Sequence, residues 1–474
     1  MSKSGLRWVI ALWTVVGAGA PGAAQAPIAR ARGPRTPPIP SDARCAGPPA
    51  LRRCAEQPIP LSLAEAVTRA TEQAPSVALA RERTTEAEER VRQARGPLLP
   101  NVSASAAWLD QAYNIRSFGF QQPTQPGQDD LVGPFDNVDA RLRLTQALFD
   151  YPSIVRVRAS RSQLAAVAAD GGVAVEGAAY TAALAYLRAA RADARLAARR
   201  ADSALAAELV TLAQAQYDAG VTPAIDVTRA RTQLAASAGA VLVTATERER
   251  ALIDLARALG LDARTPLALA DSLTDRTAAT DVLADPDVAL GRAVAGRPDL
   301  LAEIARAGAA QQAASAISAE RLPRLELAAD YGLNGPTVSD AIGTGRVGVQ
   351  LTVPIFDGLR REGRLAEQRA VAREADIRAA DARRQIGAEV QTALLELRSA
   401  AAQRDIATER LGLAQAELDQ ARERFAAGVV GNIEVIAAQV SLINARDGEI
   451  DARFTAAAAR AALARAVGAA RRIR

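Results

Sequence analysis

Few side chains in this sequence could carry out acid–base, nucleophilic or metal chemistry. The 474 residues contain no histidine, which removes imidazole from any catalytic triad, proton relay or zinc site. Acidic residues are numerous, but they alternate with arginines along the whole chain and form no compact cluster. We therefore predict no catalytic residues, and we expect neither an enzyme nor a metal or cofactor site.

The thiols are the remaining reactive groups. The only two cysteines, Cys45 and Cys54, lie in a segment rich in proline and arginine. In an oxidising compartment they could form a disulfide, and two unpaired surface thiols are the alternative. Two thiols alone do not supply the four ligands of a structural zinc site, so no metal is expected there.

The N-terminus has the order of features found in secretory signal peptides. Lys3 and Arg7 precede an apolar stretch over residues 8–20, and small residues follow it. The apolar stretch is too short to anchor the chain as a membrane-spanning helix. We predict a signal peptide over residues 1–26 and a Pro/Arg-rich extension over residues 27–61.

The overall composition favours long helices. Alanine and arginine dominate, and aromatic residues make up only 3% of the chain. The 58 basic residues exceed the 53 acidic ones by five, and the two kinds are interleaved. Since no basic stripe with aromatic partners is present, nucleic-acid binding is not expected.

The chain contains a long internal repeat. A proline-bounded segment, a Phe-Asp pair and a Gly-Val turn each occur once in the first half and again, in the same order, in the second. The matching pairs are Pro75 with Pro298, Pro100 with Pro323, Phe149-Asp150 with Phe356-Asp357, and residues 217–227 with residues 425–435.

Each copy has two segments of alternating apolar and polar residues. The clearest covers residues 347–355, and the others begin near residues 102, 138 and 325. Alternation over about ten residues fits strands that present one face to lipid and one to water, and a half-buried soluble sheet is the alternative. Most aromatic residues outside the signal segment fall in or beside these strands, which favours the membrane.

The rest of each copy reads as helix. We expect a first helix over residues 76–98 and 299–322, ended by the following proline. A helix of about 65 to 70 residues then follows each Phe-Asp pair, with the aspartate as its N-cap, and spans roughly 100 Å. Gly220 and Gly428 end the long helices, and a returning helix follows each. The first and returning helices, stacked end to end, match the long helix in length.

Together these motifs resemble the TolC-type outer-membrane efflux proteins, over nearly the whole chain after about Leu61. The resemblance implies a mainly α fold with a β-barrel part, built from two tandem β-β-α repeats. It implies a homotrimer with a twelve-stranded β-barrel in the outer membrane of a Gram-negative cell and a twelve-helix α-barrel crossing the periplasm. It also implies partners, namely a periplasmic adaptor and an inner-membrane pump, and passive conduction of substrates for efflux or type I secretion.

On this interpretation, an equatorial connector separates the two repeats. The predicted domains are the signal peptide 1–26, the extension 27–61, the first repeat 62–260, the connector 261–288, the second repeat 289–468 and the C-terminal tail 469–474.

The resemblance also suggests a gate at the helix tips, where acidic residues ring the closed pore in the family. Asp226 and Glu434 match these tip positions, and rings of carboxylates repel one another and attract cations. The sequence departs from the family at Ala437, where a second acidic residue is expected. Solvated surface carboxylates are the alternative. The tip residues predicted to contact the adaptor are Gly220, Val221, Thr222, Gly428, Val429 and Val430.

A non-conducting periplasmic coiled-coil scaffold is the alternative function. It accounts for the long helices, but it leaves the alternating strands and the Phe-Asp pairs without a role. The kind of substrate, whether drug, metal ion or protein, depends on the pump and is not encoded in these motifs.

Overall fold

A computed structural model describes residues 58–114, 131–273 and 285–473. The predicted signal peptide and both cysteines lie outside the described residues, so the disulfide remains a prediction. Within the described ranges, no helix is both long enough and apolar enough to cross a membrane.

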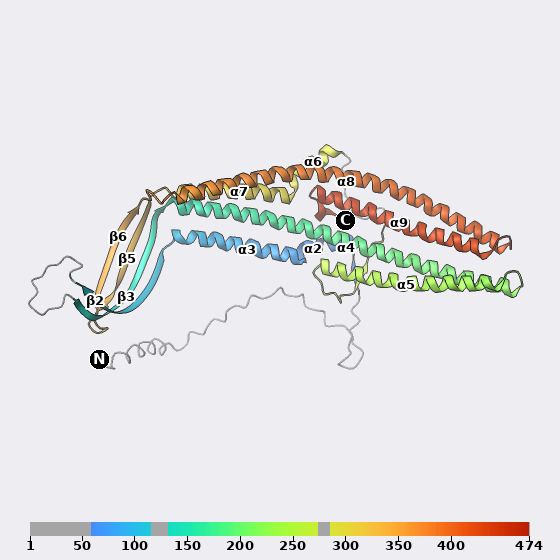
Figure 1. The fold of residues 1–474 in the computed structure, drawn as a ribbon, viewed down its shortest axis with the longest axis horizontal. Coiled ribbons are helices and arrows are strands. Elements are labelled where there is room, and N and C mark those ends of the chain that lie inside the picture. The colour runs from blue at the N-terminus through green and yellow to red at the C-terminus, as the bar shows by residue number, and fades with distance from the viewer. Residues whose placement is uncertain (1–57, 115–130, 274–284, 474) are drawn as a thin grey trace, which may run out of the picture. The chain divides into compact units, whose positions relative to one another are not determined.

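The elements occur in two copies of the same order (Figure 1). The first copy consists of α2 (Leu63–Gln73), α3 (Pro75–Arg95), the 3₁₀ turn η1 (Gly96–Leu98), β2 (Asn101–Asn114), β3 (Leu131–Asp150), α4 (Tyr151–Asp218) and α5 (Ala224–Ala258). The second consists of α6 (Pro286–Gly296), α7 (Pro298–Ala319), β5 (Arg324–Gly335), β6 (Ile342–Thr352), α8 (Arg360–Ala426), α9 (Asn432–Ala466) and the 3₁₀ turn η3 (Ala470–Arg472). The short helices α2 and α6 were not predicted from the sequence.

The helix boundaries confirm most of the prediction and correct one part of it. Asp150 caps α4 as expected, because its Oδ1 accepts a hydrogen bond from the Ser153 N–H at 3.1 Å. The prediction that Asp357 caps α8 is wrong. Gly358 and Leu359 have left-handed φ values of 70° and 65°, which delays the helix start to Arg360. Asp357 still accepts a hydrogen bond from the backbone of Arg361 at 3.1 Å.

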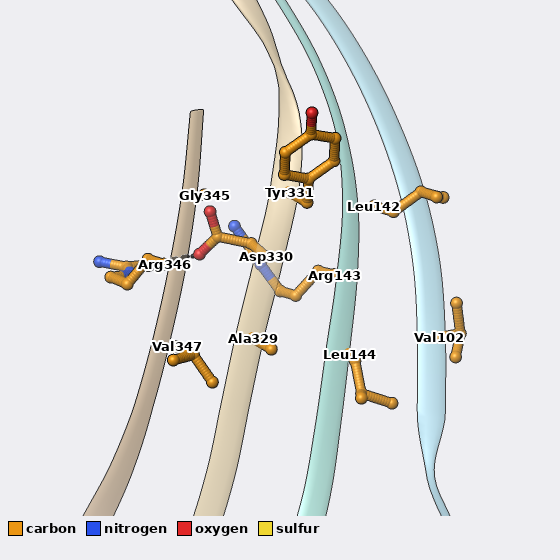
Figure 2. Close-up of a pocket in the computed structure, with 10 residues that line it drawn as sticks. All are labelled: Val102, Leu142, Arg143, Leu144, Ala329, Asp330, Tyr331, Gly345, Arg346 and Val347. Carbon is orange, nitrogen blue, oxygen red and sulfur yellow. Dashed lines mark hydrogen bonds and ion pairs between the residues drawn. The ribbon is translucent and has the colours of Figure 1, made fainter. Parts of the chain in front are cut away.

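Four strands form one antiparallel sheet in the order β2-β3-β5-β6, so strands from the two copies pair at its centre. The register places apolar residues of neighbouring strands in common rows. Val102, Leu144, Ala329 and Val347 form one such row, and Figure 2 shows all four. The alternate residues on these strands are largely polar. The sheet therefore has an apolar face and a polar face.

The helices pack as one continuous and one broken column in each copy, as the lengths predicted. α4 lies beside α3 and α5, and α8 lies beside α7 and α9 (Figure 1). The break in the first copy is tight, since a Cβ atom at Gly260 would lie 2.7 Å from the carbonyl oxygen of Gln73. At the corresponding break, a Cβ atom at Gly468 would lie 3.1 Å from Cγ of Arg297. Both glycines have positive φ and end a returning helix.

Near the middle of α4, the start of the described chain and the connector pack against the helices. Strand β1 (Ile59–Leu61) pairs in parallel with β4 (Leu267–Leu269), which lies in the predicted connector. The buried Tyr186 hydroxyl donates to the Leu61 carbonyl and accepts from the Asp271 N–H, each at 3.0 Å. Burial raises the pKa of Tyr186 to about 12, so the hydroxyl stays protonated and able to donate.

Candidate functional site

The two predicted tips are built alike, because each long helix ends in the same glycine-dependent turn. The N–H of Gly220 donates to Tyr217 O and that of Val221 to Gln216 O, both at 2.9 Å. The same pair of bonds forms from Gly428 and Val429 at 3.0 Å. This pattern is a Schellman motif, which requires the left-handed φ that both glycines adopt. The turns leave the two valines exposed, at 60% and 68%.

The structure brings the two tips of one chain together. The side-chain amide of Asn432, at the start of α9, donates to the carbonyl oxygen of Asp226 at 3.0 Å. The amide of Gln216 donates to the carbonyl of Phe425 at 3.1 Å. Asn432 is completely buried although it lies at a hairpin tip. Sequence reasoning missed Asn432, and its only signal was a polar residue at the first position of the returning helix.

The two gate candidates occupy different environments within one chain. Asp226 is buried at the contact between the tips, and its Oδ1 pairs with Arg229 Nη1 at 3.4 Å. It is therefore not a solvated surface carboxylate. Glu434 is half-exposed and pairs with Arg424 across its own hairpin, with 2.5 Å between Oε1 and Nη1. Of the other predicted tip residues, Gly220 and Gly428 are exposed, whereas Thr222 and Val430 are partly covered.

A second group of charged residues, not assigned a role from the sequence, lies on the polar face of the sheet. Arg141 donates from Nε to Asp139 Oδ1 and from Nη1 to Asp330 Oδ1, each at 2.8 Å. Its Nη2 reaches Thr344 on β6 at 3.3 Å. Asp330 also pairs with Arg346, at 3.1 Å. One guanidinium thus links three neighbouring strands.

Gly332 makes this crossing possible. It is the register partner of both Arg141 and Thr344, so the guanidinium passes over its position from β3 to β6. A Cβ atom there would lie 2.6 Å from Cγ of Arg141 and 2.2 Å from the carbonyl oxygen of Ala140. The sequence signal for this network was the alternation of charged residues with apolar ones over residues 138–144.

Ion pairs also join the two copies along the helices. Asp202 on α4 is buried and accepts from Arg199 at 3.1 Å and from Arg446 on α9 at 2.6 Å. Near the C-terminus, both carboxylate oxygens of the buried Glu176 are used. They accept from the Ala470 N–H at 2.8 Å and from Arg471 Nε at 2.6 Å. Buried charges held in this way resist separation, because removing one partner leaves the other unpaired.

The described ranges contain no group of three or more His, Cys, Asp or Glu residues placed to hold a metal ion. The features that stand out are therefore surfaces: an apolar and a polar face of one sheet, continued by helices of 68 and 67 residues that end in paired tips. A sheet with one apolar and one polar face suits contact with lipid on one side and water on the other.

Known proteins have this arrangement. A family model described as "Outer membrane efflux protein" matches residues 66–261 and 289–469, which is most of the chain. The chain belongs to the outer membrane efflux protein family. This places the protein in the outer membrane, with its helices extending into the periplasm.

Individual relatives and solved structures agree with the family. Protein CyaE of Bordetella pertussis is 28% identical over 397 residues, which cover 82% of this chain and 80% of CyaE. The outer membrane protein VceC of Vibrio cholerae is 22% identical and superposes with a TM-score of 0.70, over 86% of this chain and 96% of VceC. The CmeC outer membrane channel of Campylobacter jejuni gives a TM-score of 0.73 at 17% identity, over 86% of each chain. The efflux family and these neighbours are outer-membrane proteins rather than enzymes.

Proposed function

We propose that this efflux-family protein is the exit duct of a tripartite efflux or type I secretion system. It conducts substrates passively from the periplasmic side to the outside. The observation that carries the proposal is the sheet with two unlike faces, continued directly into the long helices. Leu142, Tyr331 and Val347 are 58%, 67% and 74% exposed on the apolar face, which suits contact with lipid. The charged network on the other face suits a water-filled interior.

The conducting unit that we propose is a trimer. In the four-stranded sheet, β2 and β6 are the edges, and each presents unpaired backbone groups on its outer side. Within a bilayer such edges must be paired, because no water is present to satisfy them. Pairing β6 of one chain with β2 of the next chain closes a ring of twelve strands when three chains assemble. Each chain also supplies two continuous and two broken helix columns, so three chains give twelve columns.

We place the gate and the adaptor contact at the helix tips. Three copies of Asp226 and Glu434 near the axis would attract cations and repel one another, so closing the tips needs the nearby Arg229 and Arg424. The exposed Val221 and its counterpart in the second tip offer apolar contacts to a periplasmic adaptor, which links the duct to an inner-membrane pump. The turns at Gly220 and Gly428 fix the positions of these valines.

The test of the proposal is the assembly and conductance of the purified protein. Size-exclusion chromatography with light scattering in detergent should give the mass of three chains. Planar lipid bilayers should then show discrete conductance steps, which a heat-denatured sample does not give. A monomeric protein without conductance would overturn the proposal and favour the scaffold function.

A further inference from the structure

The charges on the polar face of the sheet are unevenly spread along the strands. At one level, the register partners are Ser103, Arg143, Asp330 and Arg346. At the next level, Arg141 is the register partner of Gly332. One level further along, Asp139 is the register partner of Asn334 and accepts a hydrogen bond from Arg141. These three levels hold three arginines and two aspartates per chain, so each chain contributes a net charge of +1.

Both aspartates are ion-paired with neighbouring arginines. Two of the three arginines, Arg143 and Arg346, are exposed to solvent on the polar face. Asp330 has a side chain only 7% exposed, held between Arg141 and Arg346. Arg346 is 79% exposed, and Arg143 is exposed and makes no ion pair within the part of the chain that the structure describes. Figure 2 shows Arg143, Asp330 and Arg346 on three neighbouring strands. A permeating ion at this level would therefore meet guanidinium groups first.

The other charges of the polar face lie at other levels along the strands. Closer to the helices, Arg324 lies beside two carboxylates, Glu326 on its own strand and its register partner Asp150, which is buried and caps α4. Asp110 and Asp136 are register partners at the far end of the sheet. They lie on the opposite face, on the same side as Trp108 and Val138. On the polar face, arginines therefore outnumber carboxylates at the levels of Arg141 and Arg143, whereas carboxylates outnumber arginines next to the helices.

We propose that Arg143 and Arg346 form an anion-selecting level inside the duct. The inference rests on the proposed function, because it takes the polar face to line the pore of a trimer. In that trimer, the three levels that hold Arg143, Arg141 and Asp139 carry a net charge of +3 from three chains. A unit charge about 7 Å from an ion in water changes the occupancy of that ion by roughly threefold. The level therefore raises the passage of anionic solutes over cationic ones.

The side-chain contacts that join the three strands are made by a different arginine. Arg141 and Gly332 hold β3, β5 and β6 together, and they stay in place when Arg143 or Arg346 is changed. Removing Arg346 leaves Asp330 paired with Arg141. Charge selection and sheet cohesion are thus assigned to different arginines.

The experiment measures reversal potentials of the full-length trimer in planar bilayers under a KCl gradient. The double variant Arg143→Gln/Arg346→Gln should lower the chloride-to-potassium permeability ratio by about fivefold relative to the wild type. The matched double variant Arg143→Lys/Arg346→Lys keeps the charge and should keep the ratio. Arg264→Gln, at a 91% exposed site in the connector, should leave the permeability ratio unchanged.

A separate variant adds charge rather than removing it. Ser103→Glu places three carboxylates at the same level and should shift the ratio in the same direction as the double glutamine variant. If the wild type, the double glutamine variant and Ser103→Glu all have the same permeability ratio, this inference is wrong and the proposed function still stands. If the lysine and glutamine variants lower the ratio equally, the inference is also wrong, because side-chain shape rather than charge would then determine the ratio. Absence of any wild-type conductance would overturn the proposed function itself.

Discussion

Replacing Arg297 by alanine should loosen the joint at which four helices of the second copy meet. Arg297 links α6 to α7, and its side chain is only 10% exposed. Its Nε donates to Asp299 Oδ1 at 3.0 Å, and its Nη1 donates to Glu389 Oε2 on α8 at 2.5 Å. The same Nη1 reaches the carbonyl oxygen of Ala466, at the end of α9, at 3.3 Å.

The size of the effect follows from these contacts. Breaking a fully buried ion pair costs about 3–5 kcal/mol, and a hydrogen bond to a charged group contributes about 1.5–3 kcal/mol. Asp299 and Glu389 are 42% and 40% exposed, so water replaces part of what they lose. The carbonyl of Ala466 is left without its guanidinium donor. We therefore expect Arg297→Ala to lower the free energy of unfolding by about 2–3 kcal/mol.

The loss of unfolding free energy caused by Arg297→Ala should depend on pH in a defined direction. Burial opposes the charged form of Asp299, but the hydrogen bonds from Arg297 outweigh it and lower the pKa of this carboxyl below its ordinary value of 3.8. Because the pKa of this carboxyl is lower in the folded than in the unfolded state, its ion pair stabilises the fold fully at a pH above the unfolded-state pKa. This stabilisation is lost as the pH falls through the folded-state pKa. The difference between wild type and Arg297→Ala should therefore be full at neutral pH and shrink below about pH 4.

The assay is urea unfolding of the detergent-purified protein, followed by circular dichroism at neutral and acidic pH. Arg264→Ala is the control, because its ion pair with Asp262 is exposed and the change should have no measurable effect. The reasoning is refuted if Arg297→Ala is as stable as Arg264→Ala at neutral pH. It is also refuted if the loss is the same at both pH values.

Three further predictions concern the joints and the tips. Gly260→Ala should destabilise the protein by about 1–3 kcal/mol in the same unfolding assay, because Gly260 has a positive φ and an added Cβ atom would collide with the Gln73 carbonyl oxygen. Gly308→Ala is the control. This glycine on α7 has open space around it, so the change should be neutral or stabilising. Asn432→Ala should remove one of the two hydrogen bonds described between the tips and leave the bond from Gln216. The open probability of single channels should rise by roughly fivefold, the factor for about 1 kcal/mol of lost hydrogen bonding. An unchanged open probability would place the gate elsewhere. Glu434→Ala should weaken block of the conductance by divalent cations, and unchanged block would remove Glu434 from the gate.

Much of the fold could be predicted because its signals are local. Proline fixes where α3 and α7 begin, and glycine at positive φ fixes where the long helices end. The repeat then doubles each signal, so a weak motif in one copy is supported by its counterpart in the other. The start of α8 escaped prediction because Gly358 and Leu359 take a left-handed turn, although Asp357 matches the capping residue of the first copy.

The parts of the candidate site that could not be predicted depend on contacts between distant segments. Nothing local marks Asn432 as a residue that reaches the backbone of Asp226. The crossing of Arg141 over Gly332 depends on the register of three strands, which hydrophobic alternation alone leaves undetermined. The turns at Gly220 and Gly428, in contrast, could be predicted because their Schellman motifs are encoded in the adjacent sequence, and contact of these tips with an adaptor stays a prediction.

The two copies share an architecture but differ in how they are held. Where the second copy places Arg297 at the helix joint, the first has Ala74, and Gly260 packs there against bare backbone. Where the second copy places Asn432 at the tip, the first has Ala224. The hydrogen bonds from Arg297 and Asn432 at the two ends of α9 thus have no counterpart at the matching positions beside α5. Since hydrogen bonds and ion pairs fix a geometry more narrowly than small-residue packing, the first copy is the freer partner, and tip separation should begin with movement of α5 rather than of α9.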